Sequence, residues 1–231
     1  MSKEVELPDI GKVLLTKRRS SRHIRLRVAH DGIPHISLPF WVSYSQAIEF
    51  VSAKTNWIQE QKQSRAVKLL IDGQRVGKSH VLRFKPTTNG QIRTKVVGNE
   101  AIVSIPSGSA TSRDRVQKAA ERVCFRVLKL ESEVLLPQRL EQLAQLHKLS
   151  YSKVKISKMR SRWGSCNSHK LITLNCYLMQ LPWSLIDYVL LHELAHTEVM
   201  AHSNSFWALM EKLLPDYKTR RKELKTHHTT L

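Results

Sequence analysis

The fold of the C-terminal half of this chain is decided by WSLIDYVLLHELAHTEVMAH, residues 183–202. Neither proline nor glycine interrupts this stretch, and apolar side chains such as Leu185, Val189 and Leu190 recur in it at helical spacing. We therefore expect a helix from residue 181 to about residue 200. His192 and His196 are four residues apart, so on a helix they share one face and both imidazoles can reach one metal ion.

The residues around this pair complete a catalytic zinc site. Tetrahedral catalytic zinc takes three protein ligands and leaves one position open for water. His202, six residues after His196, is the natural third ligand, and Glu193 lies where it can touch that water without binding the metal. We therefore predict one Zn²⁺ ion held by His192, His196 and His202, with Glu193 as the general base for a zinc-activated water. A structural zinc is disfavoured, because such sites are usually closed by four ligands rich in cysteine.

The turn after the second histidine departs from a known pattern. The spacing HExxHxxxxxH equals that of the metzincins, which carry glycine at the third position after the second histidine. Here Val199 takes that position. Glycine permits a left-handed backbone turn at low cost, whereas valine does not. We expect the metzincin ligand spacing without the metzincin turn, and a helix that runs on past His196 and bends near residues 201–203.

A second informative stretch, RSRWGSC at residues 160–166, combines two arginines, an indole and small turn-forming residues. The guanidinium groups of Arg160 and Arg162 suit a carboxylate or a phosphate. The alternative, which the residues alone favour, is a tight loop in which Trp163 anchors the core and both arginines are solvated. Downstream, residues 171–177 read as a strand. In a zincin-like fold this strand lies beside the active-site helix, and an extended peptide can join its edge. Tyr177 and Arg162 are candidates for stabilising a charged intermediate.

These motifs together resemble the YgjP-like metallopeptidase family. The resemblance rests on RSRWGSC (160–166), LITLNCYLMQLP (171–182) and IDYVLLHELAHTEVMAHSNSFW (186–207), and it is most specific over residues 157–217. It implies a zincin-like domain in which the three histidines bind the metal and Glu193 is the catalytic acid and base. It also implies that RWGSC lies near the metal, which makes Arg162 and Ser165 pocket residues.

The rest of the chain predicts an α+β fold in two parts. Residues 1–110 alternate apolar and polar side chains between turn signals such as Asp31-Gly32 and Asp72-Gly73, which predicts an antiparallel β-rich part. This part contains one helix, which follows the capping-box pair Ser43 and Gln46 and extends to about residue 67. Residues 111–231 form the second part, the zincin-like catalytic domain with a short sheet.

Three features of the second part and its boundary are also expected. The segment from residue 111 to about residue 149 is helical in pattern, with a cap from Thr111 and Asp114, and Pro137 breaks or kinks it into two helices. The basic tail, residues 218–231, is expected to fray. A segment with the sequence GQRVGKS, residues 73–79, imitates a phosphate-binding loop, but it is one residue short and a strand follows it where that motif requires a helix.

Composition bounds the function less sharply. Lys and Arg total 38 against 19 Asp and Glu, a net charge of +19, which makes nucleic acid a possible partner without excluding a non-binding basic surface. The three cysteines are scattered and odd in number, so we expect a reducing compartment rather than a disulfide framework. The first ten residues have no apolar core of a signal peptide, and no apolar run is long enough to span a membrane. We expect a soluble, cytoplasmic protein with no membrane partner.

Three functions remain open at this point. The first is a zinc metallopeptidase that acts on a peptide or protein substrate. The second is a metal-dependent nucleoside triphosphate pyrophosphatase in which Arg160 and Arg162 lie near the phosphates. The third is a nucleic-acid-binding module in which zinc is structural, and Glu193 argues against it because it would then have no evident task.

Overall fold

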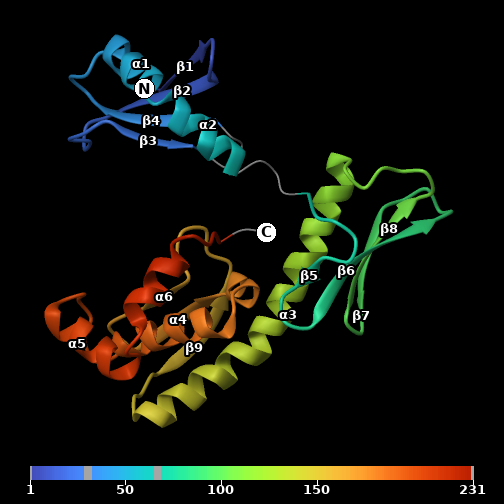
Figure 1. Cartoon of the computed structure of the whole chain (residues 1–231), viewed down its shortest axis with the longest axis vertical. Coiled ribbons are helices and arrows are strands. Elements are labelled where there is room, and N and C mark those ends of the chain that lie inside the picture. Colours follow the sequence, from blue (N-terminus) through green and yellow to red (C-terminus); the bar gives the residue numbers. More distant parts are fainter. Residues whose placement is uncertain (1, 29–32, 65–68, 230–231) are drawn as a thin grey trace. The chain divides into compact units, whose positions relative to one another are not determined.

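The computed structural model describes residues 2–28, 33–64 and 69–229, so the Asp31-Gly32 turn lies outside the described residues. The chain is α+β and divides into two compact units, residues 1–68 and residues 69–231 (Figure 1). The boundary that the sequence suggested, between residues 110 and 111, falls inside the second unit. Each unit has its own buried apolar core.

The first unit is a four-stranded sheet followed by two helices. Its strands, in the spatial order β1-β2-β4-β3, are β1 (Ser2–Leu7), β2 (Gly11–Arg18), β3 (Arg25–Val28) and β4 (Pro34–Pro39). The helices are α1 (Tyr44–Ser52) and α2 (Thr55–Ser64), where a single helix was expected. The predicted capping box is present, since Ser43 Oγ accepts from Gln46 N at 3.1 Å and Gln46 Oε1 accepts from Ser43 N at 3.1 Å.

The second unit begins with a sheet of the same topology. Its strands, in the spatial order β5-β6-β8-β7, are β5 (Arg75–Val76), β6 (His80–Thr87), β7 (Arg93–Val97) and β8 (Glu100–Pro106). In both sheets the outer pairs are antiparallel, but the central pairs, β2 with β4 and β6 with β8, are parallel. The expectation of purely antiparallel pairing was therefore wrong for the two central pairs.

Burial explains this pairing. The strands β4 and β8 have four buried residues each and no exposed residue, whereas β3 and β7 expose every second residue. A strand that is apolar along its length is stabilised in the middle of a sheet, and an alternating strand fits an edge with one face in water. After each hairpin, the more apolar of the two strands therefore lies beside the preceding strand and its amphipathic partner takes the edge.

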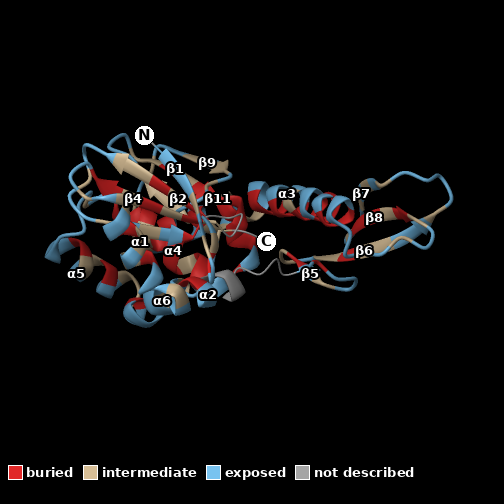
Figure 2. Cartoon of the chain, turned by 90° about the horizontal axis from the view of Figure 1, so that it is seen from above, coloured by how far each residue is buried: buried red, intermediate tan, exposed pale blue. Residues whose placement is uncertain are grey.

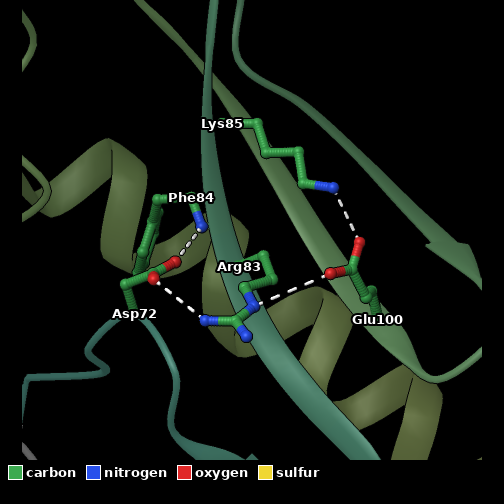
Figure 3. Close-up of polar contacts among 5 residues, drawn as sticks. All are labelled: Asp72, Arg83, Phe84, Lys85 and Glu100. Carbon is green, nitrogen blue, oxygen red and sulfur yellow. Dashed lines mark hydrogen bonds and ion pairs between the residues drawn. The ribbon is translucent and has the colours of Figure 1, made fainter.

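Exposed polar contacts accompany the parallel pair β6–β8 (Figure 3). Asp72, in the predicted Asp-Gly turn, accepts hydrogen bonds from Phe84 N at 2.7 Å and from an Arg83 guanidinium nitrogen at 3.2 Å. Glu100 of β8 then pairs with Lys85 at 2.7 Å and with Arg83 Nε at 3.6 Å. Exposed ion pairs of this kind contribute at most about 1 kcal/mol each, so the sheet depends on its buried face for most of its stability.

One long helix, α3 (Asp114–His147), joins this sheet to the catalytic part of the second unit. Pro137 lies inside it, so the expected break into two helices was wrong, as was the cap, because Arg113 is the N-cap residue and makes no capping side-chain hydrogen bond. A helix-interior proline costs about 3 kcal/mol, and here the fully buried Leu136 and Leu140 offset that cost. Because α3 shares its core with β8 and with the catalytic elements, the sheet β5–β8 belongs to the second unit.

The rest of the second unit, which contains His192, His196 and His202, has a three-stranded sheet and four helical elements. The sheet has the order β10-β11-β9, from β9 (Lys153–Ser157), β10 (Gly164–Cys166) and β11 (Leu171–Asn175). The helical elements are the 3₁₀ helix η1 (Cys176–Gln180), α4 (Trp183–Ala195), α5 (Asn204–Leu213) and α6 (Tyr217–Leu224). Tyr177 therefore lies in η1 rather than in a strand, and residues 218–224 of the basic tail belong to helix α6, where fraying was expected. None of the described helices has the length and apolar character needed to cross a membrane.

Candidate metal centre

Helix α4 carries the first two histidines. Most of its residues are buried, as the red ribbon in Figure 2 shows, because α3, α5, α6 and β10 pack around it. The regular helix ends at Ala195, and His196 is its C-cap residue. The prediction that the helix runs on to about residue 200 was therefore wrong, although the shared face of His192 and His196 was unaffected.

A compact turn brings the third histidine back to this face. Thr197 N bonds to Leu194 O at 3.0 Å, and the Thr197 hydroxyl donates to the same carbonyl at 2.7 Å, which ends the helical pattern. His196 Nδ1 donates to Val199 O at 3.1 Å. Residues 197–203 contain no residue of positive φ, so the chain turns without the left-handed conformation that glycine provides in metzincins. His202 then lies in the loop just before α5.

The three imidazoles converge. One nitrogen from each of His192, His196 and His202 lies within 4.8 Å of the other two, and the Nε2 atoms of His192 and His202 are 3.1 Å apart. Tetrahedral zinc with bonds of about 2.0–2.1 Å places ligand nitrogens about 3.3 Å apart, close to the 3.1 Å between the Nε2 atoms of His192 and His202. The bond from His196 Nδ1 to Val199 O leaves Nε2 of that ring free as a ligand atom. The geometry therefore fits a single zinc ion.

The contact between two imidazole nitrogens supports the same conclusion. His192 Nε2 lies 3.1 Å from His202 Nε2, and a cation between these two atoms would bind both lone pairs. The other nitrogen of the ring, His192 Nδ1, is buried and has no hydrogen-bond partner among the described residues.

Aromatic side chains of α5 fix the orientation of the ligands. The Phe206 ring lies 5.0, 4.5 and 4.8 Å from the rings of His192, His196 and His202. Trp207 stacks on His202 with a centroid separation of 5.5 Å. Phe206 is fully buried, so it holds the three imidazoles against rotation from one side.

Two of the three histidines, His192 and His196, have lowered pKa values that favour the neutral ring. Burial, followed by the neighbouring His196 and His202, lowers the pKa of His192 to about 3. Burial also lowers the pKa of His196. Metal-bound imidazole must be deprotonated, so both rings are in the form that binds metal at neutral pH.

Glu193 lies beside the ligands with an unusual affinity for protons. Burial raises the pKa of its carboxyl to about 8, and the charge of Arg162 acts in the opposite direction. A cation held by the three histidines would also favour the ionised carboxylate. A carboxylate tuned in this way toward neutral pH can accept a proton from water, which is the property of a general base.

Strand β10 approaches Glu193 more closely than any side chain would allow. A Cβ atom at Gly164 would lie 2.6 Å from Glu193 Oε1 and 2.7 Å from Glu193 Cγ. The half-buried Ser165 follows in the same strand, and burial together with the charge of Glu193 raises the pKa of the Cys166 thiol. The RWGSC segment therefore lies beside Glu193, close to the three histidines.

A buried asparagine, which the sequence analysis did not single out, organises the arginine-rich loop. Asn175 is fully buried at the end of β11, and its Nδ2 donates to Met159 O at 2.8 Å and to Arg162 O at 2.9 Å. Its Oδ1 accepts from Tyr177 N at 3.2 Å. The side chains of Arg160 and Arg162 remain exposed. The available signal was an amide in the middle of an otherwise apolar run, LITLNCYLM.

Tyr177 is placed differently from the other predicted site residues. It is buried in η1 with its ring 6.0 Å from Phe125 and 5.8 Å from Lys158 Nζ. Burial raises the pKa of its hydroxyl to about 12. The ring contacts described for Tyr177 include none with the three histidines.

The segment that imitates a phosphate loop contains an anion of its own. The buried carboxylate of Glu131, on α3, accepts from Lys78 N at 2.5 Å and from Ser79 N at 2.8 Å, and it contacts His80 Nδ1 at 2.7 Å. A Cβ atom at Gly77 would overlap this carboxylate. The backbone amides that would bind a phosphate are therefore already occupied, in agreement with the sequence argument against a phosphate loop.

Comparisons with known proteins point to one family. A family model described as the YgjP-like metallopeptidase domain matches residues 22–227. A solved structure, the metallopeptidase zymogen abylysin of Pyrococcus abyssi, is 26% identical, with a TM-score of 0.37 over 40% of this chain and 93% of that one. Another, the zymogen jannalysin of Methanocaldococcus jannaschii, is 21% identical, with a TM-score of 0.34 over 39% and 91%. No curated protein matched the chain.

Proposed function

The chain belongs to the YgjP-like metallopeptidase family, and from this premise we propose that it is a zinc-dependent peptidase with Glu193 as its general base. The observation that carries the proposal is the convergence of His192, His196 and His202 within 4.8 Å beside a buried carboxylate. Zinc, when bound, supplies Lewis acidity that lowers the pKa of a coordinated water to about 7 and polarises the attacked carbonyl. Glu193 takes a proton from the water and passes it to the leaving amine.

The substrate is proposed to bind along β10. This strand, rather than β11, is the free edge of the sheet, because β11 is paired on both sides and no described strand pairs with the other side of β10. Asn175 N bonds to Trp163 O at 2.9 Å, and Asn167 N bonds to Leu171 O at 3.1 Å. The backbone groups of Trp163 and Asn167 therefore face β11. Along an antiparallel strand every second residue faces the same neighbour, so Ser165 also faces β11, and the amides of Gly164 and Cys166 face the open edge.

This edge can bind an extended peptide through backbone hydrogen bonds. The scissile carbonyl would then lie near Glu193, because Gly164 touches that side chain. Arg162 leads into the same strand and has an exposed side chain, so it is proposed to contact the substrate or the developing charge. Arg160 and Ser165 are proposed as further contacts on this edge, whereas the buried position of Tyr177 gives it no such role.

The decisive test is Glu193→Gln in the zinc-loaded protein, assayed with a peptide library and a panel of nucleoside triphosphates. We expect the variant to keep its zinc and to lose peptide hydrolysis by about 10²–10⁴-fold, the usual contribution of a positioned base. Glu198→Gln is the matched control, because Glu198 is an exposed glutamate that pairs only with Lys170. Undiminished hydrolysis by Glu193→Gln would sink the base assignment, and hydrolysis of nucleotides instead of peptides would overturn the substrate class.

Metal analysis tests the ligand set separately. Removal of the His202 ring takes away one of three ligands, so His202→Ala should bind zinc far more weakly than the parent, measured by competition with a chelator. Zinc retained at parental affinity would show that the third ligand is a different group.

A further inference from the structure

The surface around the metal centre has more positive charge than its own acids can neutralise. Residues 157–229 contain ten Lys and Arg but six Asp and Glu. Four of these acids already have ion-pair partners: Asp187 with Arg139, Glu198 with Lys170, Glu211 with Lys218, and Asp216 with Arg220. A fifth acid is Glu193 itself. Several cations near the metal centre are therefore left without a carboxylate.

One of these cations, Arg221, is tied to a metal ligand through an aromatic ring. Its guanidinium lies 4.5 Å from the ring of Trp207, which stacks on His202 at 5.5 Å. Together these two distances place the Arg221 guanidinium at most about 10 Å from the His202 ring. At physiological salt, charges still act on each other over about this distance. Arg221 is exposed and has no carboxylate partner among the described residues. The pKa of His192, lowered chiefly by burial, is lowered further by this arginine.

Arg162 lies on the β10 side of the same centre. Asn175 holds its carbonyl, and two residues later Gly164 touches Glu193, so the start of the Arg162 side chain is fixed relative to the general base. Its side chain is exposed, and the ion pairs of the described residues do not include it. Arg162, just before β10, and Arg221, on helix α6, thus have guanidinium groups without an ion-pair partner among the described residues.

We propose that Arg162 and Arg221 select acidic peptides, so that the enzyme cleaves preferentially where aspartate or glutamate lies within a few residues of the scissile bond. This inference rests on the proposed peptidase function. Guanidinium groups bind carboxylates through paired hydrogen bonds, and their charge also raises the local concentration of anionic substrates. Four of the six acids nearby are already paired, a fifth is Glu193, and the sixth, Glu223, has no ion pair with either arginine among the described residues. Substrate carboxylates are therefore the groups that these two arginines lack.

The test uses the zinc-loaded full-length protein and three sets of synthetic peptides of equal length. The sets share one neutral framework and differ only in carrying Asp and Glu, Asn and Gln, or Lys and Arg at the varied positions. We expect kcat/KM to fall from acidic to neutral to basic peptides, with each arginine–carboxylate contact contributing about tenfold. The preference should weaken as salt is raised, because screening reduces the attraction.

Charge reversal assigns the effect to the two arginines. Arg162→Glu and Arg221→Glu should each lower cleavage of acidic peptides by about tenfold and raise cleavage of basic ones. Lys222→Glu makes the same change of charge on the same helix, next to Arg221, and should leave the ratio close to that of the parent. Equal cleavage of all three sets, or a ratio that neither reversal alters, would overturn this inference alone. Absence of any Glu193-dependent peptide cleavage would remove the peptidase proposal and this inference together.

Discussion

The contact between β10 and Glu193, the proposed general base, makes Gly164→Ala the sharpest test of the site. The substitution adds one methyl group to a backbone that alanine can adopt, because Gly164 is not among the positive-φ glycines. It leaves the three histidines, their α5 aromatic neighbours and the Glu193 carboxylate chemically unchanged. Any loss of activity would therefore report on the position of Glu193 rather than on its identity.

The magnitude follows from the distances. The added Cβ would lie 2.6 Å from Glu193 Oε1, 2.7 Å from its Cγ and 2.8 Å from its Cδ. Non-bonded carbon contacts are comfortable at about 3.5–4.0 Å, so the two groups must separate by about 1 Å. The glutamate has little free space to yield into, since only 5% of its surface is exposed. Misplacing a catalytic group by about 1 Å costs about 10²-fold in rate.

The assay is the rate of peptide cleavage by zinc-loaded Gly164→Ala, with zinc content measured in the same preparation. We expect kcat/KM about 10²-fold below that of the parent at full zinc occupancy, approaching the residual rate of Glu193→Gln. Thermal unfolding monitored alongside separates displacement of the base from general loss of structure. A variant with parental kcat/KM would refute the argument that β10 positions Glu193.

Two further predictions concern stability. Without metal, the protein should be most stable between about pH 4.5 and 6.5. Below this range the free energy of unfolding falls, because unfolding lets His192 take up a proton that its folded pKa of about 3 excludes. Above this range it also falls, because folded Glu193 keeps its proton up to about pH 8, whereas unfolded Glu193 has already lost it. Urea unfolding in chelator checks both limbs, each worth a few kcal/mol, and the alkaline limb should vanish in Glu193→Gln. Glu131→Ala should cost about 2–4 kcal/mol, because it removes a buried carboxylate that accepts from two part-buried backbone amides and contacts His80. The exposed Glu133→Ala should cost under about 0.5 kcal/mol, and equal unfolding midpoints for the two variants would contradict this.

The residues of the metal centre that the sequence revealed are those related by local geometry. His192, Glu193 and His196 lie within a single turn and a half of helix, so their spacing alone brings them together. His202 follows within one short loop. By contrast, Gly164 and Glu193 are separated in the sequence by β11 and η1, and no local sequence pattern predicts their contact. Arg221 was missed for the same reason, because its meaning depends on the packing of α6 near Trp207.

The fold shows the same division between local and non-local information. The capping box at Ser43 was predictable because both of its partners lie within four residues. The end of α4 was not, since apolar side chains continue past Ala195 and the chain turns away through the hydrogen bonds of Thr197 and His196. At Pro137 the sequence predicted the end of a helix that in fact continues. The local cost of proline in a helix is outweighed there by burial of the helix on either side.

The two four-stranded sheets share a topology that local sequence patterns did not predict. They have the same strand order and the same pairing, although the sequence contains no recognisable internal repeat. In the second sheet, the turn that Glu131 anchors to α3 also bears Lys78, whose ammonium group bonds to Leu181 O and lies 5.0 Å from the ring of Trp183, where α4 begins. This sheet therefore reaches the start of the helix that carries the metal ligands. The first sheet packs on helices α1 and α2 and shares a core with them. The same strand topology therefore supports the helix that bears the histidines in the second unit and forms the core of the first unit.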